Sequence, residues 1–196
     1  MNTSHHIASI VGLCVAALTA PALAAPPPAA AVQKPLKTLI NSIRYAKYDL
    51  AAKQLAFDEM VKRLLATDAA KFSADEQKEV TRAIEAIIRA DAFTKSKDRF
   101  QYIDNVLYEE PRENGTDVLC KSTIVIHHEL KKTELVIDWV LIKDAGAYKI
   151  VDMILLGEGI IAGIREDQVQ PLLSEGGPAK VMETIRKKVA EVSKRK

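Results

Sequence analysis

Aromatic residues are scarce in this chain of 196 residues and make up 5% of it. Single-stranded nucleic acids are usually bound by stacking their bases on aromatic side chains, so this function is disfavoured. No sign of charge prevails, because 28 Lys and Arg residues are balanced by 26 Asp and Glu residues. The positive charges are also mixed with negative ones rather than clustered, which disfavours a surface for duplex nucleic acids. The 48% apolar and 28% charged residues are instead typical of a globular protein.

Motifs for catalysis or cofactor binding are also missing. The chain has no P-loop and no serine in a nucleophile elbow. His127 and His128 are neighbours on a predicted strand, so their side chains point to opposite faces and cannot share a metal ion. The glycines of residues 157–163 resemble a dinucleotide fingerprint, but the third comes one residue late and no parallel βαβ unit follows. We therefore expect no enzyme and no cofactor.

Cysteine is nearly absent, with Cys14 and Cys120 the only two. Cys14 lies in an apolar run, Ile7 to Leu18, which is too short to span a bilayer and fits the core of a secretory signal peptide. Small residues at Ala22 and Ala24 favour cleavage after Ala24, which defines residues 1–24 as the signal peptide; a partly buried N-terminal helix is the alternative. The exported chain then has one thiol, Cys120, and cannot form an internal disulfide.

Helical patterns occupy both ends of the exported chain. Residues 25–34 are rich in Pro and Ala and predict an extended linker before a single domain, residues 35–196. Apolar residues recur at helical spacing over residues 35–67, and Ser73 with Glu76 forms a capping box for a further helix. Helical periodicity returns at residues 160–173 and restarts after Gly176-Gly177-Pro178.

Between these helices the chain is rich in β-branched residues. Short turns, Asn114-Gly115 before the first run and residues 144–147 before the last, separate the segments. Four strands are predicted: residues 102–109, 118–126, 134–142 and 148–156. Helices, then consecutive strands, then helices predict an α+β fold with an antiparallel sheet of about four strands.

The last two predicted strands are apolar on both faces. Only Asp152 is polar between Ile150 and Leu156, whereas a half-buried strand alternates apolar and polar residues. Helices covering both faces of the sheet would explain this pattern, and so would an internal apolar cavity.

These residues resemble a known pattern, the C-terminal signature of the MlaC family of periplasmic phospholipid-binding proteins, also called toluene-tolerance or ABC-transporter auxiliary proteins. The matching residues are Asp138-Trp139-Val140-Leu141, Gly146 to Asp152, Gly157, Ile160-Ile161 and Arg165. The helical half agrees in order through Phe57 to Met60 and Phe72 to Gln77. The chain resembles a divergent member, because Tyr148 replaces the usual Trp and Gly159 the usual Ser.

The resemblance implies a sheet wrapped by N- and C-terminal helices around an apolar pocket for phospholipid tails. It implies a periplasmic, monomeric carrier that moves phospholipid between an outer-membrane lipoprotein–porin complex and the MCE-domain protein of an inner-membrane ABC transporter, and so maintains outer-membrane lipid asymmetry. The alternative is an exported structural or chaperone-like protein with a filled core. The two differ in whether lipid co-purifies with the protein.

Aliphatic walls are what acyl chains require, because they replace water without needing hydrogen bonds. For this pocket we expect a lining of Met60, Leu64, Ile84, Ile88, Ile137, Trp139, Leu141, Ile150, Ile154 and Ile164. Arg165 is the candidate for the lipid phosphate, by charge-assisted hydrogen bonds. The alternative for Arg165 is an internal ion pair with Asp152.

Overall fold

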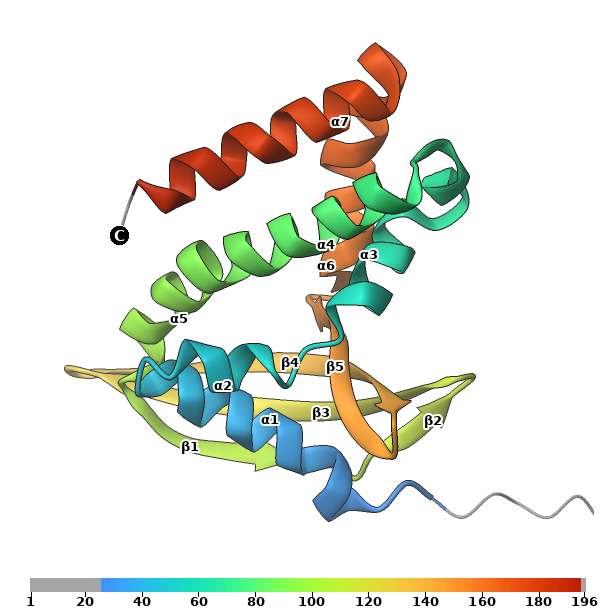
Figure 1. Cartoon of the computed structure of the whole chain (residues 1–196). Helices are drawn as coiled ribbons and strands as arrows, with labels where there is room; N and C mark the ends of the chain where they lie inside the picture. Colours follow the sequence, from blue (N-terminus) through green and yellow to red (C-terminus); the bar gives the residue numbers. More distant parts are fainter. Residues whose placement is uncertain (1–25, 195–196) are drawn as a thin grey trace, which may run out of the picture.

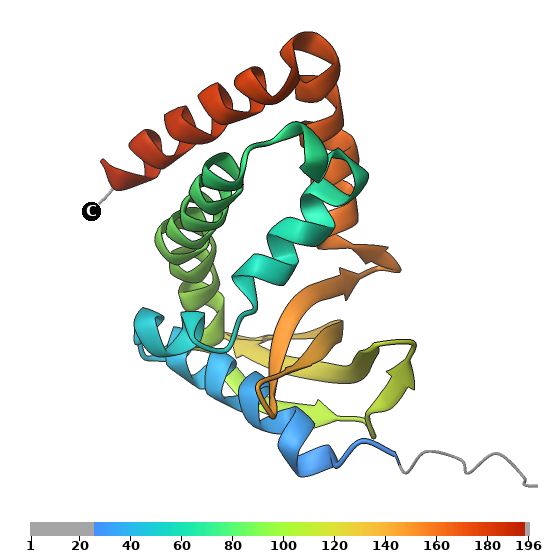
Figure 2. The ribbon, with the colours of Figure 1, turned by 45° about the vertical axis from the view of Figure 1, so that its right-hand side comes forward.

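The computed structural model describes residues 26–194, which form one antiparallel sheet with helices before and after it. The predicted signal peptide and its cleavage site lie outside these residues. Figures 1 and 2 show α1 and α2 lying across the sheet, and a second layer of helices, from α3 to α7, stacked above it. The predicted α+β fold with an antiparallel sheet between N- and C-terminal helices is confirmed.

The first helix begins earlier than the sequence predicts. α1 (Ala29–Arg44) includes most of the segment that we expected to be an extended linker. Alanine is the strongest helix former, and Pro28 precedes the helix in an extended conformation that suits an N-cap. Val32 is fully buried, so packing against the core stabilises this first part of the helix.

The helices that follow α1 begin and end close to most of the positions that the sequence predicts. The capping box is confirmed, because Ser73 Oγ accepts from the backbone N–H of Glu76 at 3.2 Å and Glu76 Oε2 accepts from the N–H of Ser73 at 2.8 Å. The helix that begins there continues through a π-turn to Phe100. The elements are α2 (Tyr48–Ala52), α3 (Phe57–Leu65), the 3-10 helix η1 (Ala66–Lys71), α4 (Ala74–Ile87), the π-helix η2 (Ile88–Ala92) and α5 (Phe93–Phe100).

The sheet has the order β1-β3-β4-β5-β6, with β2 also paired to β3, and every pair is antiparallel. Four strands are long, as predicted, and two are short. Gly115 and Gly146 have φ of +64° and +86° in the turns before β3 and β5, a conformation that glycine adopts without strain. The strands are β1 (Ile103–Tyr108), β2 (Arg112–Asn114), β3 (Asp117–His128), β4 (Lys131–Asp144), β5 (Ala147–Leu155) and β6 (Glu158–Gly159).

The segment between α2 and α3 lies beside β5. The N–H of Ala56 donates to the carbonyl of Ile150, and the N–H of Ile150 donates to the carbonyl of Gln54, both at 2.9 Å. These bonds satisfy part of the outer edge of β5 and bring the start of α3 onto the sheet.

The chain ends in α6 (Ile160–Ile164), the π-helix η3 (Arg165–Val169) and α7 (Gln170–Ser193). The break predicted at Gly176 and Gly177 is confirmed, because both have non-helical backbone angles within α7. Within residues 26–194, none of the helices has the length and apolar character that crossing a bilayer requires.

Three apolar clusters hold the layers together. The sheet-core cluster lies between one face of the sheet and α1, α2 and α5, and includes Trp139, Leu141 and Leu36. The helical cluster joins α3, α4 and α7 through residues such as Val80 and Met182. The third is small: Leu119, Val140 and Val151 on the opposite face of the sheet.

Candidate functional site

A run of large apolar side chains on α4 and η2 is only half-buried. Ile84, Ile87 and Ile88 are spaced so that they lie on neighbouring positions of one helical face. None of the three is fully buried, although apolar residues of this size usually are. This helical face is therefore covered incompletely by the rest of the chain.

Further half-buried apolar side chains surround the sheet-core cluster. Met60 on α3, Ile88 on η2, Leu135 on β4, and Met153 and Leu155 on β5 all pack against it while keeping part of their surface exposed. We call these five residues the apolar rim. They come from both layers of the fold, so the rim lies where the upper helices meet the sheet.

A cleft of about 330 Å³ opens beside the apolar rim, between the end of β5 and α6. Leu155 belongs to both features and connects them. The cleft, which we call the β5–α6 cleft, is lined by Leu155, Glu158, Gly159, Ile160, Gly163, Ile164, Asp167 and Gln168.

Arg165 joins the start of η3 to the end of α3. Its Nη1 donates to the carbonyls of Leu64 and Leu65 at 2.8 and 2.7 Å, and its Nη2 forms an ion pair with Asp68 at 2.5 Å. The last carbonyls of a helix have no donor within the helix. The guanidinium of Arg165 provides the hydrogen-bond donors for the last two carbonyls of α3. Lys71 and Gln170 also donate to Asp68, each at 2.8 Å, and with Arg165 they hold the pKa of this carboxyl well below its usual range.

The alternative expectation for Arg165, an ion pair with Asp152, is thus wrong. The Asp152 carboxylate accepts instead from the backbone N–H groups of Met153 and Ile161, at 2.8 and 3.2 Å. It therefore fixes the turn from β5 into α6 by local hydrogen bonds. Burial raises the pKa of Asp152, because the charged form is partly removed from water.

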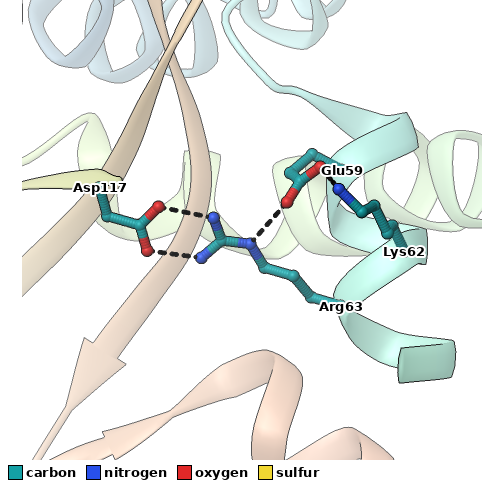
Figure 3. A network of polar contacts seen from close by, with 4 residues as sticks. All are labelled: Glu59, Lys62, Arg63 and Asp117. Atoms are coloured by element: carbon teal, nitrogen blue, oxygen red, sulfur yellow. Dashed lines mark hydrogen bonds and ion pairs between the residues drawn. The ribbon is translucent and has the colours of Figure 1, made fainter. Parts of the chain in front are cut away.

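A second arginine ties α3 to the sheet (Figure 3). Arg63 donates to both carboxylate oxygens of Asp117, at the start of β3, at 2.8 and 2.7 Å. Its Nε also donates to Glu59 at 3.3 Å, and Lys62 pairs with the same glutamate at 3.3 Å. The hydrogen bond with Asp117, against a smaller opposing effect of burial, raises the pKa of Arg63. α3, which carries Met60 of the rim, is held near its C-terminal end both by this pair and by Arg165.

A model of the family described as MlaC protein matches residues 36–187. The chain belongs to the MlaC family. The resemblance inferred from the sequence is therefore confirmed over most of the domain.

The fold of this MlaC family member is also found among solved structures. One is described as the phospholipid-binding protein from Ralstonia solanacearum in complex with a phospholipid. The likeness covers 84% of this chain and 98% of that chain, with a TM-score of 0.68 and 13% sequence identity. A search of curated proteins finds no match.

The residues predicted to line the pocket fall into several groups in this MlaC protein. Ile137, Trp139, Leu141 and Ile150 are almost fully buried in the sheet-core cluster beneath α1 and α2. Met60 and Ile88 belong to the apolar rim, Leu64 is buried, and Ile84 packs on the helical cluster. Ile154 packs on the third cluster, on the opposite face of the sheet, and Ile164 lies in the β5–α6 cleft. Contact of these residues with lipid stays a prediction.

Sequence reasoning missed three members of the rim, Leu135, Met153 and Leu155. All three lie in runs of consecutive apolar residues, residues 135–137 and 153–156, so the alternation of apolar and polar residues does not reveal which face each occupies. The register supplies the signal: Leu135 pairs with Ile124 and Met153 with Trp139, which places both on the face that α1 covers.

Other polar candidates are accounted for by the fold. Burial raises the pKa of the Cys120 thiol to about 11, so the thiol stays protonated at neutral pH. His128 makes an edge contact with Tyr102, with 4.1 Å between ring centroids. Across residues 26–194, no three His, Cys, Asp or Glu side chains come together in a group that could hold a metal ion.

Proposed function

We propose that this protein is a phospholipid carrier of the periplasm. It shields acyl chains from water and moves phospholipid between complexes of the outer and inner membranes, which maintains the lipid asymmetry of the outer membrane. The observation that carries the proposal is membership of the MlaC family together with the fold that the chain shares with the phospholipid-binding Ralstonia protein. It is a binding and transport function, and the mechanism uses no catalytic residue.

The energetic requirement of such a carrier is large. Two acyl chains contain about 30 methylene groups, and at about 0.8 kcal/mol each their exposure to water costs on the order of 20 kcal/mol. The apolar rim and the isoleucines of α4, η2 and α6 offer aliphatic surface that is already partly exposed in the structure. Covering this surface with acyl chains removes it from water together with the ligand.

Loading requires the two layers to separate. The β5–α6 cleft, about 330 Å³, lies at the lower end of the range of about 300–1,000 Å³ for small-ligand sites. Two acyl chains need more room. We infer that the apolar side chains of η2, β5 and α6 move apart to admit them, because these side chains are already partly exposed.

Arg165 remains our candidate for the head group. Its guanidinium is already bonded to Asp68 and to two carbonyls, so a lipid phosphate would have to share this site with the Asp68 carboxylate. Extraction of bound lipid from folded Arg165→Ala tests the role: unchanged lipid content removes it.

The direction of transport must come from partners, since the sequence has no nucleotide-binding motif. We propose that the monomer receives or delivers lipid at the MCE-domain protein of an inner-membrane ABC transporter and at an outer-membrane lipoprotein–porin complex.

A filled core is the feature that favours a second function. Ile137, Trp139, Leu141 and Ile150 are almost fully buried by the chain itself, as expected for an exported structural or chaperone-like protein without a lipid ligand. That protein would be as stable without lipid as with it.

Mass spectrometry separates the two functions. The protein is exported with its own N-terminal segment, purified without detergent or added lipid, and measured under native conditions and after organic extraction. A carrier gives an added mass in the range of phospholipids and extractable phospholipid at up to one molecule per chain. A bare polypeptide mass, with no uptake from phospholipid vesicles, would exclude the carrier.

A further inference from the structure

The surface around the β5–α6 cleft exposes an unusual amount of apolar side chain. Ile160 and Ile164 are 36% and 37% exposed, and Leu156, which follows β5, is completely exposed. We call Leu156, Glu158, Ile160, Ile164 and Asp167 the β5–α6 surface. In Figure 2 the end of β5 and β6 lie at the right-hand edge of the molecule, and α6 rises from them toward the upper helices.

In the described part of the chain, no packing contact accounts for a leucine at position 156. Its φ of +54° lies in the left-handed region, which a bulky side chain rarely adopts and which costs conformational energy. Its side chain is completely exposed, so it adds no packing to the core formed by residues 26–194. The exposed apolar surface of Leu156 is therefore available for contact with another molecule.

The exposed charged side chains between residues 155 and 168 are all negative. Glu158, Glu166 and Asp167 are exposed, and none forms an ion pair or side-chain hydrogen bond with any residue among 26–194. The only cation between residues 155 and 168 is Arg165, and its guanidinium is directed toward Asp68. Elsewhere on the chain, exposed carboxylates commonly pair with a lysine or arginine, as Glu79 does with Arg186. The β5–α6 surface thus has two uncompensated negative charges, those of Glu158 and Asp167, next to exposed apolar groups, and Glu166 adjoins it in the sequence.

Hydrogen bonds within the chain already order the backbone of the β5–α6 surface. Asp152 holds the N–H of Ile161, and Arg165 holds α3 and Asp68 at the other end of α6. A surface that is already ordered loses little conformational entropy on binding, which favours association.

We propose that the β5–α6 surface docks a segment of a partner protein in which lysine or arginine residues flank an apolar side chain. Charge complementarity decides the class of partner: the unpaired carboxylates of Glu158 and Asp167 attract a basic segment and repel the negative surface of an anionic bilayer. The apolar side chain of the partner would enter the cleft beside Ile160 and Ile164. Docking stands independently of the proposed lipid function; only its further consequence, that the partner would sit next to the rim through Leu155, rests on that function.

Fluorescence anisotropy tests the proposal with a labelled synthetic peptide of leucines flanked by lysines. Its matched control is the same peptide with glutamate in place of lysine. The full exported protein is compared with Glu158→Gln/Asp167→Asn and with Leu156→Ser, which leave the fixed backbone contacts in place. The control protein is Glu113→Gln/Glu129→Gln, which removes two exposed charges elsewhere. We expect the basic peptide to bind about tenfold more weakly to each surface variant and equally to the control protein, with a salt dependence that the double variant largely loses.

Four results would overturn the proposal. The surface variants could bind the basic peptide as well as the unmodified protein does, or the control protein could weaken binding by the same factor, which indicates attraction by net charge alone. Phosphatidylglycerol vesicles could bind to this surface in co-sedimentation, which assigns it to a membrane. Light scattering could detect a dimer that Leu156→Ser abolishes, which assigns it to a second copy. Lipid content of the same samples is measured separately, so its loss would count against the carrier function and not against docking.

Discussion

Arg165 and Asp68 are 97 positions apart in the sequence, and an ion pair of 2.5 Å joins their side chains. The pair is mostly enclosed, with 20% and 12% of the two side chains exposed. The pair joins two segments of the upper helical layer, because Arg165 begins η3 and Asp68 lies in η1. The same guanidinium terminates α3, so a single side chain sets how three segments meet above the sheet.

Replacing Arg165 is expected to destabilise the protein. Arg165→Ala leaves the carbonyls of Leu64 and Leu65 without donors and the Asp68 carboxylate without its arginine, and we expect Tm to fall on the order of 5 °C. Arg165→Lys keeps the charge but not the fork, so it should recover only part of the loss. Thermal unfolding followed by circular dichroism measures both variants. Arg112→Ala, an exposed arginine on β2, is the control, and an equal effect there would contradict the assignment.

Acid sensitivity should be linked to Asp68. Three donors hold its pKa well below the ordinary 3.8, so the ionised carboxylate stabilises the folded state above that pH, and the stabilisation is lost as the pH falls toward the lowered pKa. Asp68→Asn should be less stable than the unmodified protein at neutral pH. The difference should shrink once the pH drops below about 4. Urea unfolding over a pH series measures it, and a difference that grows on acidification would refute the link.

The bidentate pair of Arg63 and Asp117 should contribute to the attachment of α3. Both side chains are less than one third exposed, so a double-mutant cycle with Arg63→Met and Asp117→Asn is expected to give a coupling energy on the order of 1 kcal/mol. The matched cycle uses Lys132 and Glu134, an exposed pair at 3.0 Å, for which we expect a smaller coupling. Similar couplings in both cycles would mean that the Arg63 pair does not anchor the helix.

Local sequence signals predicted the strands and several helix ends because their causes are local. The β-branched residues of the long strands, the Asn114-Gly115 turn, and the capping box of Ser73 and Glu76 act within a few residues. Membership of the MlaC family could likewise be inferred from residues near the C-terminus.

The features that sequence reasoning missed depend on contacts between distant segments. Asp152 is closer in sequence to Arg165 than Asp68 is, yet packing of η1 against η3 brings Asp68 to the guanidinium. The start of α1 was missed because burial of Val32, which no local pattern reveals, favours helix over an extended Pro- and Ala-rich segment. Likewise, Trp139 and Leu155 are both apolar strand residues, and their local sequence does not reveal that one is enclosed and the other stays partly exposed.

A buried hydrogen bond of Trp139 offers a test of whether this side chain is enclosed in the sheet-core cluster. Trp139 Nε1 donates to Ser122 Oγ at 2.8 Å, and both residues are almost completely buried. Ser122→Ala leaves the indole N–H without an acceptor and should cost about 1–3 kcal/mol in the free energy of unfolding. In the Trp139→Phe background the indole N–H is already gone. Adding Ser122→Ala there should lower the free energy of unfolding by less than Ser122→Ala does in the unmodified protein. Additive losses would mean that the bond is not formed in solution.

Lipid loading should depend on the apolar rim more than on other exposed apolar residues. Ile88 is half-buried between η2 and the sheet core, so Ile88→Asn should leave the fold intact while placing an amide against the acyl chains. Burying that amide without a partner costs on the order of 1 kcal/mol, or about fivefold in affinity for a fluorescent phospholipid. Leu107→Asn is the matched control, because Leu107 is 57% exposed on β1 and belongs to no apolar cluster. If both variants take up lipid equally, measured by transfer from vesicles, the rim does not contact the acyl chains, and the fully buried residues Ile137 and Trp139 become the next candidates.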